Sequence, residues 1–278
     1  MLRVLVPIDF SEGAANTLRY ALQLARIISA ELVIFYGNII PMPMTDMPVV
    51  TDMPDEDAID KKMEEEVEKA ITSLKEKNEI KISYLVKPGY SLDVAINEAA
   101  EESKADLVVM GTHGATGIRK VLIGSNTVSV IATSKCPVLS VPERYEFIQP
   151  RLILVPSDLK FIEEELLDAV PFAELLGTTL EVLFFSDATE DAMKRYDVAS
   201  KVIGENSYKK IKLSIEGIQF GKTIAQDIEI AVKKKEPDML IMFRHKHNWL
   251  GNLFLTSQTD QVAFATKIPL LAFREPEK

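Results

Sequence analysis

Residues 106–132, DLVVMGTHGATGIRKVLIGSNTVSVIA, place an apolar strand, a glycine-rich loop and a helix in direct succession. The run LVVM has no alternation of polar and apolar residues, as in a parallel strand covered on both faces. Gly111 and Gly114 then let the backbone approach a ligand closely. Gly124 and Ser125 open the helix, and free N–H groups at a helix start favour phosphate. The order predicts an α/β fold with a site for an anionic ligand.

The chain repeats the pattern around this segment. RVLVPIDFS from Arg3 matches RLILVPSDLK from Arg151, and KPGYSLDVAINEAA from Lys87 matches QFGKTIAQDIEIAV from Gln219. Each copy has five strands alternating with helices, and its strands are continuous apolar runs. Alternating strands and helices are typical of a doubly wound parallel sheet. We therefore predict two tandem α/β domains, each a five-stranded parallel sheet with helices on both faces, in a Rossmann-like arrangement.

The predicted domains are residues 1–146 and 147–278, and they differ in the middle. An insert from Asn38 carries several prolines, which exclude a regular helix or central strand. We expect the stretch 38–57 to be a loop that leads to an acidic helix from Met63.

Composition limits the kind of protein. The 278 residues are 47% hydrophobic and 27% charged, which is typical of a soluble globular protein. A net charge of -10 argues against nucleic acid and anionic membranes as partners. No apolar run is long enough to cross a membrane, and the first residues resemble a strand rather than a secretory leader. Cys136 is the single cysteine, so no internal disulfide is expected, and we expect a cytoplasmic protein.

The spacing of the glycines adds a resemblance. Gly111, Gly114, Gly124 and Ser125 form G-x2-G-x9-G-[ST], which resembles the ATP-binding members of the universal stress protein family. The resemblance covers both halves and implies two tandem domains paired through their last strands. It makes ATP or AMP, with or without Mg²⁺, the expected ligand. A further homodimer is left open.

The same resemblance assigns roles to residues of the first copy. It implies that Pro7 and Ile8 line the adenine and that Asp9 lies near the adenosine. It also implies that the backbone of Met110 and Gly111 contacts the nucleoside, and that Gly124, Ser125 and Asn126 take the phosphates. Arg119 is added because a cation in the loop would contact an anionic ligand. The full set is Pro7, Ile8, Asp9, Gly37, Met110, Gly111, His113, Gly114, Arg119, Gly124, Ser125 and Asn126. Gly37 stands where the family usually has a small apolar residue after the second strand.

Several alternatives stay open at this stage. The loop glycines could do no more than form turns. Asp9 could serve as a helix N-cap, a role that Ser11 could also fill. His113 could be a solvated loop histidine rather than a catalyst, and we assign no catalytic residue. The favoured function is a nucleotide-gated regulatory protein with an unidentified protein partner. The alternatives are a slow ATPase or nucleotide transferase, and a nucleotide-independent interaction module.

The second copy departs from the motif. Phe243 replaces the first glycine, Lys246 the second and Thr256 the third. Side chains at these places would crowd a pyrophosphate, so we predict that this half binds no ATP in the family manner. His245 and His247 lack a cysteine or carboxylate that would complete a metal set, and no metal site is predicted.

Overall fold

The structure, a computed structural model, describes residues 1–39, 56–74, 80–89, 91–112, 124–244 and 267–274. The chain divides into two units, Met1–Phe147 and Ile148–Lys278, and each contains five of the described strands. Within the residues described, no helix is both long enough and apolar enough to cross a bilayer.

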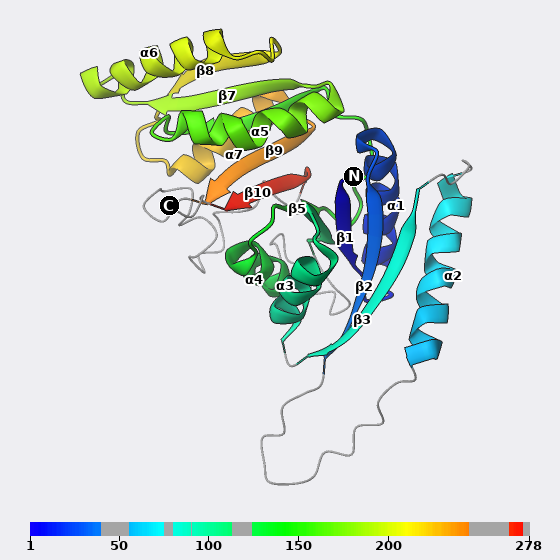
Figure 1. The fold of residues 1–278 in the computed structure, drawn as a ribbon. Helices are drawn as coiled ribbons and strands as arrows, with labels where there is room; N and C mark the ends of the chain where they lie inside the picture. The colour runs from blue at the N-terminus through cyan, green and yellow to red at the C-terminus, as the bar shows by residue number, and fades with distance from the viewer. Residues whose placement is uncertain (40–55, 75–79, 90, 113–123, 245–266, 275–278) are drawn as a thin grey trace. The chain divides into compact units, whose positions relative to one another are not determined.

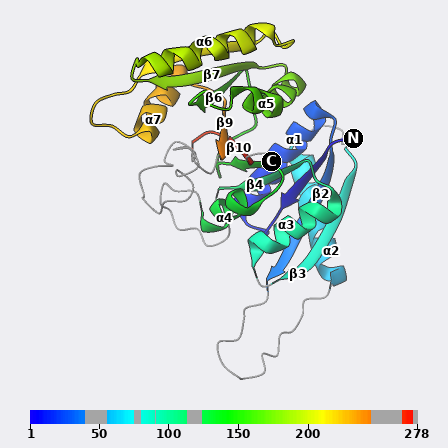
Figure 2. The ribbon, with the colours of Figure 1, turned by 60° about the vertical axis from the view of Figure 1, so that its left-hand side comes forward.

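The first unit alternates strands and helices throughout. Its elements are β1 (Arg3–Pro7), α1 (Glu12–Ile28), β2 (Glu31–Ile39), α2 (Glu56–Leu74), β3 (Ile82–Gly89), α3 (Leu92–Ser103), β4 (Leu107–Gly111), α4 (Ser125–Thr133) and β5 (Val138–Val141). The five strands are parallel, in the order β3-β2-β1-β4-β5. Helices α1 and α2 pack together on one face, and α3 and α4 pack together on the other (Figures 1 and 2). The predicted doubly wound fold is confirmed for this unit.

Burial in β1 shows why the sheet needs two helical layers. Val4, Leu5 and Val6 are consecutive and all fully buried. Successive strand residues point to opposite faces, so both faces of β1 must be covered. Helix α1 supplies one cover through a stripe of apolar residues at helical spacing that includes Leu18 and Leu22, both of which are buried. Each such leucine stabilises the fold by about 1.5–3 kcal/mol.

The second unit has the same plan. Its elements are β6 (Leu152–Ser157), α5 (Ile162–Leu176), β7 (Thr179–Ser186), α6 (Glu190–Glu205), β8 (Ile211–Gly217), α7 (Ile224–Lys235), β9 (Met239–Arg244) and β10 (Leu270–Arg274). The strands are parallel, in the order β8-β7-β6-β9-β10. The prediction of a second doubly wound domain is confirmed. The pairing of the domains through their last strands stays a prediction.

A matched aspartate fixes the start of each sheet. The backbone N–H of Arg3 donates to Asp106 Oδ2 at 2.8 Å, and that of Arg151 donates to Asp238 Oδ2 at 2.7 Å. In each unit the aspartate directly precedes the strand that pairs with the first strand. The aspartate thereby helps to hold the register of these two neighbouring strands.

Two predictions about the middle of the first unit are wrong. Strand β2 does not stop before Asn38, because β3 runs beside it as far as the pair Ile39 and Gly89. Helix α2 begins at Glu56 and not at Met63. Its buried stripe starts one turn before Met63, at Ile59, which continues the helical spacing of apolar residues. Residues 40–55 of the insert lie outside the described residues.

Candidate nucleotide site of the first unit

The strand order of the first unit reverses beside β1. Strand β1 lies between β2, its direct successor in the chain, and β4. Open α/β sheets bind ligands beyond the carboxyl ends of strands at this switch point. The strands that meet there end at Pro7 in β1 and Gly111 in β4. The predicted nucleoside contacts Pro7, Met110 and Gly111 therefore come together at one edge.

Asp9 lies in the turn that follows β1. The N–H of Ile8 donates to Phe35 O at 2.9 Å and extends the strand pairing by one residue. The Asp9 side chain is exposed, and its Oδ1 accepts the Ser11 N–H at 3.0 Å. Ser11 Oγ accepts the Ala14 N–H at 3.1 Å and is the N-cap of α1. The interpretation of Asp9 as the helix cap is thus wrong, and its carboxylate lies at the switch point.

Phe10 has a backbone conformation that the sequence did not indicate. Its φ is +61°, in the left-handed region that disfavours residues with a bulky side chain. The Phe10 ring packs on Tyr36 with centroids 5.0 Å apart, and Lys62 Nζ lies 4.1 Å from the ring centroid. These contacts from β2 and α2 offset the backbone strain and fix the turn that carries Asp9.

Hydrogen bonds close the base of the glycine loop. The N–H of Thr112 donates to Val141 O at 3.0 Å, and the N–H of Gly124 donates to Thr112 O at 2.7 Å. Thr127 Oγ1 donates to Gly111 O at 2.8 Å. Helix α4 therefore begins directly at the carboxyl end of β4, as the segment 106–132 predicts. The loop residues His113, Gly114 and Arg119 lie outside the described residues.

The N-cap residue of α4 is a glycine. Gly124, with φ -61° and ψ 149°, makes no side-chain cap hydrogen bond, and no such bond to the first turn is found among the described residues. Ser125 and Asn126, the first two residues of the helix, are exposed. Uncapped first-turn N–H groups and the helix dipole favour a bound anion.

Gly37 is not placed as predicted. It lies within β2 opposite Lys87 of β3, because the strand continues to Ile39. A Cβ at Gly37 would stand 3.2 Å from Leu92 Cδ1 and 3.5 Å from the Phe35 ring. The first residue of α3 thus passes so close to β2 that a side chain at residue 37 would crowd it.

An unpredicted contact holds α4 against α3. Ser129 Oγ donates to Asp93 Oδ2 at 2.6 Å, and Ser91 Oγ donates to the other carboxylate oxygen. These hydrogen bonds, from Ser129 first and then Ser91, lower the pKa of Asp93. Across the described residues, no group of three or more His, Cys, Asp and Glu side chains is placed to hold a metal ion.

The sequence matches a known family model in both units. The model of the universal stress protein family matches residues 1–142 and 151–274. The chain belongs to this family. A universal stress protein of Methanocaldococcus jannaschii is 30% identical over 145 residues, which cover 50% of this chain and 81% of the relative. A universal stress protein of Synechocystis is 30% identical over 150 residues, covering 50% of this chain and 96% of that protein.

A solved structure matches nearly the whole chain. A universal stress protein of Archaeoglobus fulgidus has a TM-score of 0.68 at 20% identity, covering 99% of this chain and 98% of that one. The likeness shows that the tandem arrangement of two such folds occurs in another member of the universal stress protein family.

The second universal stress protein unit has phenylalanines where the first has glycines. Pro7 pairs with Phe35, and its counterpart Pro156 pairs with Leu183, so Phe185 occupies the place of Gly37.

The same comparison of registers places Phe243 at the position of Gly111. Phe243 is 1% exposed and stacks on Phe273 with centroids 5.3 Å apart. Aromatic side chains fill this edge of the second sheet.

The turn after β6 nevertheless keeps the backbone of its counterpart. Leu159 has φ +62°, as Phe10 has +61°. Asp158 Oδ1 accepts the Lys160 N–H at 3.1 Å, but the Asp158 side chain is buried, whereas that of Asp9 is exposed. Arg195 of α6 donates to the carbonyl of Asp158. The second unit therefore keeps the backbone conformation of this turn, but the carboxylate of Asp158 is not exposed as that of Asp9 is.

Proposed function

We propose that the first unit binds an adenine nucleotide, ATP or AMP, and acts as a nucleotide-gated regulatory module. The observation that carries the proposal is the 2.7 Å hydrogen bond from Gly124 N–H to Thr112 O. It brings the uncapped start of α4 to the switch point, beside the strand end that precedes Asp9. The start of α4 suits the anionic phosphate end of a nucleotide. Asp9 suits a hydroxyl or amino group at the nucleoside end.

The phosphates would lie on the first-turn N–H groups of α4. Phosphate is favoured there by both the unpaired donors and the helix dipole. Ser125 and Asn126 can add side-chain donors, because both are exposed at the first turn. Mg²⁺ would neutralise phosphate charge without requiring a protein ligand.

The nucleoside would lie over the ends of β1 and β4. Ile8 is 7% exposed and Met110 is 6% exposed. A nucleoside would therefore contact mainly their backbone and one edge of each side chain. Asp9 presents an exposed acceptor, which suits a ribose hydroxyl. The proposal assigns these residues to binding and none to catalysis.

Gating would act through α4. A bound phosphate adds contacts to the α4 N-terminus, and a ligand shifts a conformational equilibrium only by its difference in affinity for the two states. A protein partner that contacts this edge would then distinguish nucleotide-bound from free protein. Equal partner affinity with and without nucleotide would contradict gating.

The second unit is proposed to bind no nucleotide. Phe185 stands at the position of Gly37 and Phe243 at that of Gly111, and both side chains are buried. Opening space there would expose aromatic surface, which opposes ligand entry.

Calorimetric titration of nucleotide-stripped protein with magnesium-ATP tests the proposal. We expect one ATP per chain, and we expect Gly124→Val to abolish the heat. The φ of -61° at Gly124 suits any residue, so the added side chain acts by its bulk. Gly204→Val is the matched control, since a Cβ at Gly204 meets nothing within 4 Å. Equal binding by the two variants would refute the proposed site.

Turnover separates this proposal from a slow ATPase. Phosphate release by the wild type should stay at the rate of uncatalysed hydrolysis, and Asp9→Ala should leave it unchanged. A steady release that Asp9→Ala removes would make the first unit an enzyme instead.

A further inference from the structure

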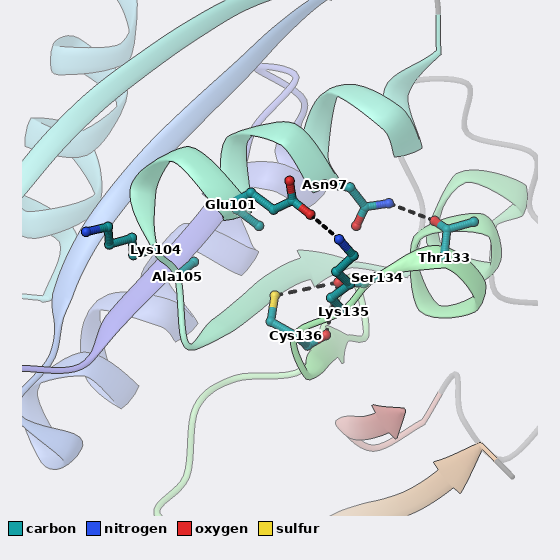
Figure 3. A pocket seen from close by; sticks show the side chains of 9 residues that line it. Asn97, Glu101, Lys104, Ala105, Thr133, Ser134, Lys135 and Cys136 are labelled. Atoms are coloured by element: carbon teal, nitrogen blue, oxygen red, sulfur yellow. Dashed lines mark hydrogen bonds and ion pairs between the residues drawn. The ribbon is translucent and has the colours of Figure 1, made fainter. Parts of the chain in front are cut away.

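A cavity in the first unit and the outer face of α5 in the second unit have no part in the proposed nucleotide site. The cavity, of about 280 Å³, lies between α3 and the segment after α4 (Figure 3). Its polar side chains already bond one another, as Lys135 Nζ does with Glu101 Oε1 at 2.7 Å, so the cavity does not indicate a ligand. The outer face of α5 is apolar and exposed instead.

The exposed apolar side chains of α5 form one row. Leu167, Pro171 and Leu175 are spaced four residues apart, so they lie on one side of the helix, and we call them the α5 stripe. Leu167 is 75% exposed and Leu175 is 43% exposed, and Pro171 is exposed as well. The other side of the helix is buried where α5 packs on β7 (Figure 1). Scattered exposed leucines are ordinary, whereas a contiguous apolar row indicates a contact surface.

Helix α1 is the counterpart of α5 in the first unit. Ser29 and Gly177 are the left-handed residues that end the two helices, and they fix the alignment of α1 with α5. The same alignment pairs Leu18 with Leu166, and both leucines are buried. The two helices can therefore be compared position by position.

In the first unit the chain itself covers the outer face of α1 with residues 142–147, PERYEF. Asn16 Nδ2 donates to Tyr145 O at 3.1 Å. The ring of Tyr20 is buried and packs edge-on against Phe147, with centroids 4.9 Å apart. A short segment with aromatic side chains thus lies across α1, held by a backbone acceptor and by ring contacts.

The corresponding positions of α5 differ in charge and in hydrogen bonding. Glu164 stands where α1 has Asn16, and Asp168 stands where it has Tyr20. An amide that donates to a carbonyl is thereby replaced by a carboxylate that only accepts. Burial raises the pKa of the Asp168 carboxyl, and a cation beside it would offset the cost of its charge. The outer face of α5 therefore suits a segment that brings donors and positive charge.

We propose that the α5 stripe binds an extended segment of a partner protein that carries Lys or Arg beside aromatic side chains. The aromatic side chains pack on the α5 stripe, and the cations pair with Glu164 and Asp168. Pro171 has no N–H, so the Leu167 carbonyl does not receive the usual helical hydrogen bond, and a backbone N–H of the segment donates to it. The interaction does not depend on nucleotide binding.

Charge favours this partner over other occupants of the stripe. A second copy of the chain has a net charge of -10, and α5 packed on α5 would oppose carboxylates, because the helix has several Glu and Asp residues and no Lys or Arg. An anionic membrane surface would be repelled for the same reason. Residues 275–278, EPEK, follow β10 as residues 142–147 follow β5, but they have two glutamates and no aromatic side chain.

Methyl NMR titration of the full chain with short peptides tests the proposal. The probe is the hexapeptide PKRYKF, which is the segment 142–147 with both glutamates replaced by lysine. The peptide PERYEF tests the charge, and PKRAKA tests the rings. We expect PKRYKF to shift the methyl signals of Leu167 and Leu175 saturably, and each control peptide to bind at least about tenfold more weakly.

Two substitutions separate the surface from the stability of the fold. Leu167→Arg should weaken PKRYKF binding at least about tenfold, read from the Leu175 methyl signals. The variant should fold, because Arg19 occupies this position in α1. Phe220→Arg is the matched control: it adds the same charge at a fully exposed side chain outside α5, and it should leave PKRYKF binding unchanged.

Three results would overturn the proposal. Leu167 and Leu175 signals that stay unmoved at about 5 mM PKRYKF would refute binding at the stripe. Equal binding of PERYEF and PKRYKF would show that the carboxylates of α5 do not select a basic segment. Signals of α5 that shift with protein concentration alone, and stay constant in Leu167→Arg, would assign the stripe to a second copy of the chain.

Discussion

Gly124→Asp separates helix stability from nucleotide binding at the same N–H groups. The backbone of Gly124, at φ -61° and ψ 149°, already has N-cap geometry, so an aspartate fits without rearrangement. Its carboxylate would accept the first-turn N–H groups of α4 that we assign to phosphate. The substitution therefore stabilises the helix while it occupies and charges the proposed site.

The two effects have opposite signs. An Asp cap improves on Gly by a few tenths of a kcal/mol, and its charge beside the helix dipole adds about 0.3–1 kcal/mol. We expect unfolding of the first unit to move up by about 1–4 °C. ATP should bind at least about a hundredfold more weakly, which corresponds to about 2.8 kcal/mol. The phosphates lose their donors and meet a like charge.

Differential scanning calorimetry and ATP titration of the same sample measure both effects. Gly124→Asn is the matched control, because it caps the helix without adding charge, and we expect it to weaken ATP by no more than about tenfold. Unchanged ATP affinity in a stabilised Gly124→Asp protein would refute the placement of phosphate at α4.

Three further predictions concern the surroundings of the site. Thr127→Val should destabilise the protein by about 1–3 kcal/mol in denaturant unfolding, because Gly111 O loses its buried donor; no change would show that the bond to Gly111 is dispensable. Ser129→Ala should raise the pKa of Asp93 in a carbon-detected NMR titration. The folded-state pKa of Asp93 is lowered, so its stabilising contribution is present above the ordinary carboxyl pKa and is lost as pH falls through the lowered value. The variant should lose less stability over that acid range, and an identical acid limb would contradict this assignment. Phe243→Ala should cost about 3–5 kcal/mol of unfolding free energy and leave the number of bound ATP molecules unchanged; a second bound ATP would show that Phe243 alone closes the second unit.

Much of the fold follows from local patterns in the sequence. Unbroken apolar runs such as LVVM predict buried parallel strands, and the stripe containing Leu18 and Leu22 predicts α1. The repeat of Pro-x-Asp at Pro7 and Pro156 predicts two similar units. These features depend on spacing along one chain segment, which a sequence displays directly.

The errors arise where one segment depends on another. Strand β2 continues past Gly37 because β3 runs beside it, and neither strand alone indicates that length. Ser11 and Asp9 are both good caps, and the choice between them follows from the left-handed turn at Phe10. That turn is held by Tyr36, which is distant in sequence.

At the candidate site, the sequence indicated the helix start but not what positions it. The glycine spacing indicated Gly124, while Thr112 and Thr127 were missed because their bonds join the two ends of the loop. Thr112 O accepts the Gly124 N–H, and Thr127 Oγ1 donates to Gly111 O. The contact from Asp93 to Ser129 joins two helices and has no motif.

Equilibrium dialysis of the nucleotide-stripped chain against labelled ATP, and separately against labelled AMP, counts the sites directly. One ATP per chain is expected, bound by the first unit, with the second unit closed by Phe185 and Phe243. Two ATP molecules per chain would contradict the closure of the second unit, and no bound ATP or AMP would contradict the nucleotide site of the first.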